Sequence, residues 1–108
     1  MSLILGNLEE TILLLVLVLG DKEAYAVSVA EAHRDQMGKT ISIPAVHTVL
    51  SRLEEKGLLT SALGDASPVR GGKRKRIYHV TKLGQRVLSE IRANRIKLWE
   101  QVPAFKPA

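Results

Sequence analysis

Three glycines divide the first half of the chain into segments with the periodicity of helices. Gly20, Gly38 and Gly57 each follow a stretch in which apolar residues recur every three or four positions. Glycine is common immediately after a helix because it adopts the left-handed conformation of a C-terminal cap without steric cost. With 108 residues, 45% of them hydrophobic, the chain is long enough for one domain with its own core. We therefore expect three helices in this half, over about residues 8–19, 24–37 and 43–56.

The third segment, residues 43–56, has the most regular pattern. Ser42 precedes it as a suitable N-cap, and Pro44 fits its first turn. Its inner stripe is predicted to be Val46, Val49, Leu50 and Leu53. The opposite face is small, polar and barely charged, which is unusual for a face in solvent but suits the reading of base edges in a DNA groove. The residues of this face are Pro44, Ala45, His47, Thr48, Ser51 and Arg52.

Arg52 has a second interpretation, as the partner of Glu55 on the same helix. The neighbouring Lys56 carries a like charge, so the sequence leaves both roles open. His47 and Thr48 lie nearer the start of the helix and are the stronger candidates for contact with bases.

The second segment, residues 24–37, is less regular. Its spacing predicts an inner face made of Val27, Ala30 and either Arg34 or Met37. The link that follows, Lys39-Thr40-Ile41, is short and β-prone, and a strand of two or three residues is expected there.

The second half of the chain is strongly basic and begins with a hairpin pattern. Residues 58–63 and 77–80 read as two strands, joined by a turn rich in Gly, Asp, Ser and Pro. At the end of this turn the chain reads Arg-Gly-Gly-Lys-Arg-Lys-Arg over residues 70–76. Residues 66–108 carry 11 Lys and Arg against two acidic residues, whereas residues 1–65 carry five against nine. The basic half therefore predicts a polyanionic partner, with nucleic acid and an anionic membrane surface as the candidates.

Two helices at the ends of the chain are predicted to form a dimer. Residues 8–19 are apolar nearly all round after Glu10, so this helix has to be covered on two sides. Thr81 can cap a last helix over residues 82–102, whose apolar side extends beyond the compact unit. The expected interface residues are Leu8, Ile12, Leu15, Val16, Leu19, Leu88, Ile91, Leu98 and Trp99. Together with Tyr78, Trp99 could instead line a pocket for an effector.

Three helices followed by a basic hairpin are the order of a winged helix-turn-helix, a mainly α fold with a small β hairpin. The domain is expected over residues 5–81, and residues 82–102 form a C-terminal dimerisation helix. In such a domain the third helix enters the major groove, and the tip of the hairpin, called the wing, lies on the neighbouring backbone or minor groove.

The chain resembles the PadR family of transcriptional regulators. The resemblance rests on "LGNLEETIL" from Leu5, "IPAVHTVLSRLEEKG" from Ile43 and "GGKRKRIY" from Gly71, together with Ala24-Tyr25 and Thr81, and it spans about residues 5–92. It implies a bacterial, dimeric, DNA-binding repressor, often responsive to a small hydrophobic or aromatic effector. Two departures concern His47, where the family commonly has tyrosine, and Ala26, where it commonly has glycine.

The same resemblance assigns roles to individual residues. Tyr25, at the start of the second helix, would lie near the DNA phosphates. The recognition helix would present Ser42, Ala45, His47, Thr48, Ser51 and Arg52. The wing would consist of Arg70, Gly71, Gly72, Lys73, Arg74 and Lys75.

Other classes of function find no support in the sequence. The absence of cysteine excludes thiolate catalysis, disulfides and zinc ligation by thiolates, and the three histidines lack the spacing of metal ligands. No catalytic grouping, cofactor motif or membrane span is present, so we expect a cytoplasmic DNA-binding protein that is not an enzyme. The competing hypothesis is a winged helix that binds another protein instead of DNA.

Overall fold

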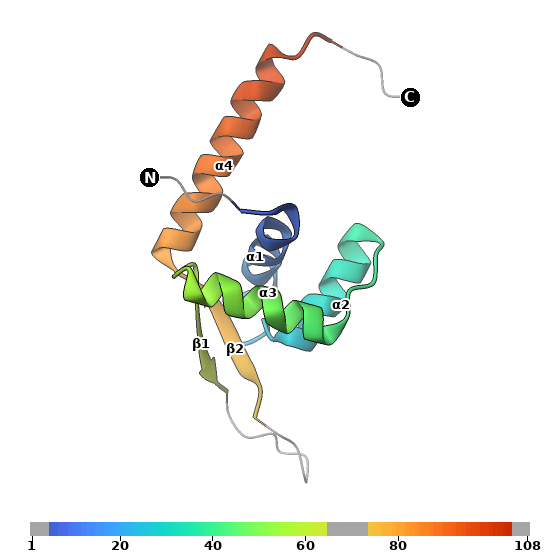
Figure 1. Ribbon diagram of the computed structural model, residues 1–108, viewed down its shortest axis with the longest axis vertical. Helices are drawn as coiled ribbons and strands as arrows, with labels where there is room; N and C mark the ends of the chain where they lie inside the picture. The colour runs from blue at the N-terminus through green and yellow to red at the C-terminus, as the bar shows by residue number, and fades with distance from the viewer. Residues whose placement is uncertain (1–4, 65–73, 105–108) are drawn as a thin grey trace.

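The computed structural model describes residues 5–64 and 74–104 of the chain (Figure 1). The elements occur in the predicted order, four helices and a two-stranded hairpin. Their bounds are α1 (Asn7–Leu19), α2 (Ala26–Met37), α3 (Ile43–Glu55), β1 (Leu59–Leu63), β2 (Arg76–Val80) and α4 (Lys82–Gln101). The fold class is therefore confirmed as α+β, with α2 beginning two residues later than expected.

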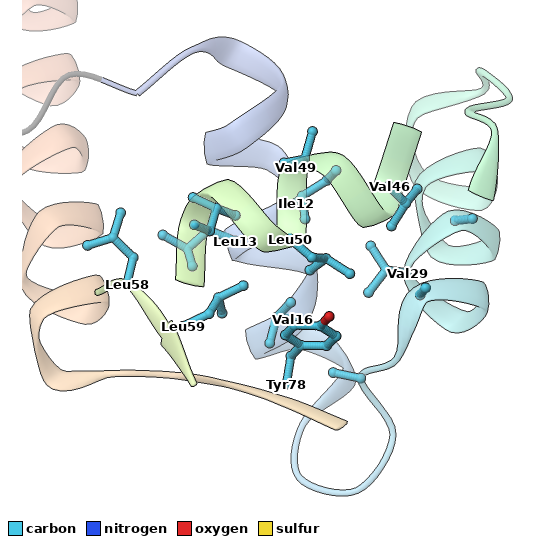
Figure 2. Packing of buried hydrophobic residues seen from close by; sticks show 14 of the residues in the cluster. Ile12, Leu13, Val16, Val29, Val46, Val49, Leu50, Leu58, Leu59 and Tyr78 are labelled. Atoms are coloured by element: carbon cyan, nitrogen blue, oxygen red, sulfur yellow. The ribbon is translucent and has the colours of Figure 1, made fainter. Parts of the chain in front are cut away.

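The core lies between α1, α2, α3 and the hairpin, as Figure 2 shows. The inner stripe predicted for α3 is confirmed, because Val46, Val49, Leu50 and Leu53 are all buried. The largest fully buried side chains come from the first three helices and the start of the hairpin: Ile12, Leu13, Val29, Val46, Leu50, Leu53, Leu58 and Leu59. The core is thus almost entirely aliphatic, as the scarcity of aromatic residues requires.

The inner face of α2 differs from the prediction. Val27 and Met37 are 45% and 51% exposed, and Arg34 is exposed as well. Ala30 is buried as predicted, and the other buried residues of the helix are Ala26, Val29 and His33. Ala26, Val29 and His33 also lie at helical spacing with Ala30, so spacing alone did not decide which residues face inward. The His33 ring is accommodated there because its Nδ1 lies 2.9 Å from the Lys39 carbonyl oxygen.

The strand expected at residues 39–41 is not formed. These residues are irregular, and the described part of the chain contains one sheet, in which β1 and β2 pair antiparallel. The Lys39 carbonyl contacts the His33 ring instead of a strand partner, which explains why β-propensity did not decide the local structure.

The hairpin is joined to the helices by Tyr78. In the register of the sheet Tyr78 lies opposite Ser61, and its ring points into the core beside Val16 and Leu59 (Figure 2). Its backbone N–H donates to the Ala24 carbonyl 2.8 Å away, just before α2 begins. Burial raises the pKa of the Tyr78 phenol above its usual range, so the ring stays neutral inside the domain. The root of the wing is therefore held rigidly against the start of α2.

The start of α4 is fixed by the predicted cap, Thr81. Its Oγ1 accepts from the Gly84 backbone N–H at 3.0 Å and donates to the Gly57 carbonyl at 2.7 Å. Gly84 itself is buried against the chain after α3. A Cβ at this position would lie 2.4 Å from the Leu58 carbonyl oxygen. Only glycine therefore lets α4 approach the hairpin this closely.

Replacing Gly84 with alanine will destabilise the domain, although alanine is the better helix former by about 1 kcal/mol. The added methyl group meets backbone, so relief requires α4 to shift, and we expect a loss of about 1–3 kcal/mol in the free energy of unfolding. Urea denaturation followed by circular dichroism measures it. Ser89→Ala, at an exposed position of the same helix, is the control and should be neutral or slightly stabilising. Stabilisation by Gly84→Ala would contradict the close approach.

An ion pair joins the start of α1 to the end of α3. The Lys56 ammonium lies 2.6 Å from Glu9 Oε2, and Glu9 also accepts a bond from the Gly6 backbone N–H. The Lys56 hydrogen bond, more than any other interaction, lowers the pKa of Glu9 below its usual value, against the opposing effect of burial.

The contribution of this pair to stability should depend on pH. Because the pKa of Glu9 is lower in the folded chain than in the unfolded one, the stabilisation is present above the unfolded value of 4.5 and is lost as the pH falls through the folded value. We expect Glu9→Gln to cost about 0.5–1.5 kcal/mol at pH 7 and almost nothing near pH 3. Parallel urea titrations at the two pH values measure this. Glu10→Gln is the control, because Glu10 forms no ion pair within the described residues.

Candidate nucleic-acid interface

The predicted reading face of α3 is open to solvent. Ser42, Pro44, His47, Thr48, Ser51 and Arg52 are exposed and Ala45 is half-buried. Ser42 is the N-cap, with its Oγ accepting from the Ala45 backbone N–H at 3.2 Å. Because the inner stripe packs in the core, the opposite face points to solvent. The helix therefore offers mostly small polar groups from Ser42 to Ser51. Such a surface can approach base edges closely.

The hydroxyl groups on this face have distinct chemical capacities. Thr48 Oγ1 donates to the Pro44 carbonyl at 3.1 Å, so its lone pairs and methyl group remain for a partner. It can therefore accept from a base amino group or contact a thymine methyl. Ser42 accepts from the backbone, which leaves its hydroxyl hydrogen able to donate to a phosphate oxygen.

Arg52 is exposed, and no carboxylate among residues 5–64 and 74–104 forms an ion pair with it. The alternative pairing with Glu55 is therefore not formed. The positive charge of Arg52 makes a small contribution to lowering the pKa of Glu9, after the larger effects of Lys56 and Gly6. His47 and Thr48 lie nearer the N-terminus of the helix.

The root of the wing is held by three basic residues, each with its own contact. Arg74 Nε donates to the Gly64 carbonyl at 2.7 Å. The Lys75 ammonium lies 4.0 Å from the centroid of the Tyr25 ring. Arg76 Nη1 donates to Ser61 Oγ at 3.1 Å. The predicted wing residues Arg70, Gly71, Gly72 and Lys73 lie outside the described residues.

A chain of contacts that the sequence did not suggest links the wing to α3. Ser61 Oγ, which accepts from Arg76, donates to Glu54 Oε2 at 2.8 Å. No local spacing indicates this contact, because Arg76, Ser61 and Glu54 lie on three different elements. It fixes the direction of Arg76, which is thereby a structural residue of the hairpin.

Residues 14–90 match the model of the transcriptional regulator PadR-like family. The chain belongs to the PadR-like family. The resemblance found in the sequence is thereby confirmed, and the members of this family are transcriptional regulators and not enzymes. The chain is also 35% identical over 101 residues to an uncharacterised protein of Lysinibacillus sphaericus, covering 94% of this chain and 85% of that protein.

Solved structures of PadR-like proteins share the fold. One from Eggerthella lenta, a PadR family transcriptional regulator, is 30% identical with a TM-score of 0.61, covering 82% of this chain and 76% of its own. A PadR-like transcription factor from Bacteroides fragilis superposes with a TM-score of 0.70 at 23% identity, covering 87% and 84% of the two chains.

In this PadR-like chain the hairpin and α4 extend toward opposite ends of the molecule (Figure 1). Tyr25 is half-buried at the N-cap of α2, on the side of the hairpin. A surface formed by α3, the hairpin and Tyr25 is therefore well separated from the far end of α4.

The predicted dimer residues divide into two groups. Ile12, Leu15, Val16 and Leu88 are buried within the chain itself, and Leu19 and Ile91 are half-buried. Leu8, Leu98 and Trp99 are exposed, by 60% and 62% for the last two. Three apolar residues of α1 that the prediction did not include are also exposed: Leu14, Leu17 and Val18. Because α1 is apolar all round, its sequence gave no indication of which residues face outward.

An open groove of about 550 Å³ lies between α1 and α4. Its lining includes Leu14, Leu17, Leu88 and Ile91 with two arginines, Arg92 and Arg95. The pocket suggested between Tyr78 and Trp99 is not formed within one chain, because Tyr78 lies in the core and Trp99 is about 25 Å along α4 from its start.

Within the described ranges, no group of three or more His, Cys, Asp or Glu side chains is placed to hold a metal ion. The helices of residues 5–64 and 74–104 also include none that is both long and apolar enough to cross a membrane.

Proposed function

We propose that the protein is a homodimeric repressor that binds a palindromic operator in double-stranded DNA. The observation that carries this proposal is the exposed, nearly uncharged face of α3 beside a basic hairpin held rigidly to the domain. The helix supplies contacts to bases and the wing supplies contacts to phosphates. A repressor of this kind acts on the chromosome and therefore in the bacterial cytoplasm.

The proposed dimer forms through α1 and α4. Its support includes apolar side chains exposed on these two helices, Leu8, Leu14, Leu17, Val18, Ile96, Leu98 and Trp99, and Val102 directly after α4. Burial of such surface against a second copy is favourable by about 25 cal/mol per Å². A two-fold axis would place the two α3 helices in successive major grooves about 34–36 Å apart.

Effector control is the second part of the proposal. The groove between α1 and α4 is mostly apolar and adjoins the proposed interface, so a small hydrophobic or aromatic molecule bound there could alter the spacing of the two α3 helices. Operator affinity measured while candidate ligands are titrated tests this. Ligands that bind the protein but leave operator affinity unchanged would count against effector control.

The DNA-binding proposal is tested by two classes of variant. Replacing Lys73, Arg74 and Lys75 with alanine should weaken binding to every duplex, because phosphate contacts carry no sequence information. The control replaces Lys82, Arg86 and Lys97 with alanine. It removes the same charge from α4 instead of the wing and should lower DNA affinity much less. Thr48→Val should cost about 1–3 kcal/mol at the operator and little on random DNA.

The operator itself can be identified by selecting bound fragments from random duplex DNA. A palindrome with half-sites one helical turn apart is the expected result. The competing function, a winged helix that binds another protein, predicts no enrichment and indifference to the wing substitutions. The unbroken basic run over residues 73–76 favours DNA, because a protein-binding module has no need of it.

A further inference from the structure

Tyr25 and Lys75 are 50 residues apart in the sequence and are brought together where the wing meets α2. The Lys75 ammonium lies 4.0 Å from the centre of the Tyr25 ring, well within the range of a cation–π interaction. Both residues belong to the predicted DNA-binding surface, but the family resemblance assigns them separate roles, Tyr25 near the phosphates and Lys75 in the wing.

The Tyr25 ring is attached to a well-anchored part of the backbone. Tyr25 is the N-cap of α2, and its N–H donates to Ser28 Oγ at 2.9 Å. That hydroxyl in turn donates to the Glu23 carbonyl at 2.6 Å. The preceding residue, Ala24, accepts the backbone bond from Tyr78 of β2. The backbone that carries the ring is therefore fixed relative to the hairpin.

Lys75 has a contact at its backbone and another at its side-chain ammonium. Its carbonyl accepts from the Gly64 backbone N–H at 2.6 Å, and its ammonium lies at the ring. A freely rotating lysine side chain carries about 2 kcal/mol of rotamer entropy, part of which is lost when it is ordered on binding a phosphate. An ammonium over a ring face still has N–H groups directed away from the ring, and these can donate to a phosphate oxygen.

The other two described basic residues at the wing root differ from Lys75. Arg74 and Arg76 bond to Gly64 and Ser61, which belong to the first arm of the hairpin itself. Of the three, Lys75 alone has its charged group in contact with the helical part of the domain.

We propose that Tyr25 is a positioning residue for DNA binding, whose ring holds the Lys75 ammonium in place for a phosphate. The inference rests on the proposed function and assigns the effect to the ring of Tyr25 and not to a direct contact by its hydroxyl. Preorganisation of this kind raises affinity because less side-chain order has to be lost on binding.

Four substitutions, made singly and in one double variant, separate the ring from the hydroxyl and test the coupling. Tyr25→Phe keeps the ring, so operator affinity should stay within about 2-fold of the parent. Tyr25→Leu removes the ring and should lower affinity by about 5- to 30-fold for a dimer with two wings. In the Tyr25→Leu background, Lys75→Met should cost clearly less than it does in the parent, because the lysine is no longer held. Lys75→Arg keeps the interaction and should retain most of the affinity.

A spectroscopic measurement on the free protein tests the position of Lys75 without DNA. The ring should shift the ε-methylene protons of Lys75 upfield in the parent and in Tyr25→Phe, and this shift should disappear in Tyr25→Leu. Thermal unfolding of each variant checks that the fold is retained, and an unchanged midpoint together with lost affinity supports positioning.

Two results would overturn the inference. Tyr25→Phe losing as much affinity as Tyr25→Leu would assign the effect to the hydroxyl. Strictly additive losses for Tyr25→Leu and Lys75→Met would show that the residues act independently. In both cases the parent still binds its operator and the proposed function stands. A parent protein that binds no duplex would instead overturn both proposals.

Discussion

Raising the salt concentration from 50 to 200 mM will lower the affinity of the protein for duplex DNA by about 10³–10⁵-fold. This range applies to a dimer that neutralises about 6–10 phosphates, because each contact releases a condensed cation when it forms. The net charge of +5 per chain and the concentration of 11 basic residues after residue 65 provide the charges. Fluorescence anisotropy with a labelled operator, repeated at several salt concentrations, gives the slope of log affinity against log salt.

The wing substitutions make this measurement specific. Lys75→Met removes one charge from each protomer and should reduce the slope by about 2. Lys97→Met, at an exposed position near the far end of α4, removes the same charge and should leave the slope nearly unchanged. A slope near zero for the parent protein would contradict DNA binding through the basic hairpin.

Replacing Tyr78 with alanine will destabilise the domain by about 3–5 kcal/mol. The ring is only 4% exposed and packs among aliphatic side chains, so its removal leaves a cavity in the part of the core that supports the hairpin. Chemical denaturation measures the loss.

Two controls locate the origin of that loss. Tyr78→Phe retains the packing and should cost far less than the alanine variant. His79, at the next position of β2, is exposed, and its Nδ1 lies 3.2 Å from Asp21 Oδ1. Because this pair is exposed to solvent, His79→Ala should change the free energy of unfolding by less than about 1 kcal/mol. Equal losses at Tyr78 and His79 would contradict the burial of the Tyr78 ring.

Local physical chemistry was sufficient to predict the helices and the N-caps of α3 and α4. In α3 the contrast between the stripe at Val46, Val49 and Leu50 and the polar residues between them fixes the rotation of the helix. Ser42 and Thr81 were predicted as N-caps, and both accept a backbone N–H as expected. The polar face of α3 follows directly, because a helix with one apolar stripe has to turn its other face to solvent.

Pattern alone was less informative where the apolar contrast was weak. In α2 two sets of residues have helical spacing, and packing against α1 and α3 selected the one that contains His33 over the one with Met37. Residues 39–41 have β-propensity but no partner strand, so propensity did not produce a strand there.

Residues within a few positions of one another were sufficient to predict the order of the helices, the basic hairpin and the sparsely charged face of α3. The tertiary structure alone decided which side of α1 faces outward, the close approach at Gly84 and the contact between Tyr25 and Lys75. These features join residues that are far apart in the chain or choose between equally apolar faces. Helical periodicity specifies which residues share a face, but only packing in three dimensions specifies what that face meets.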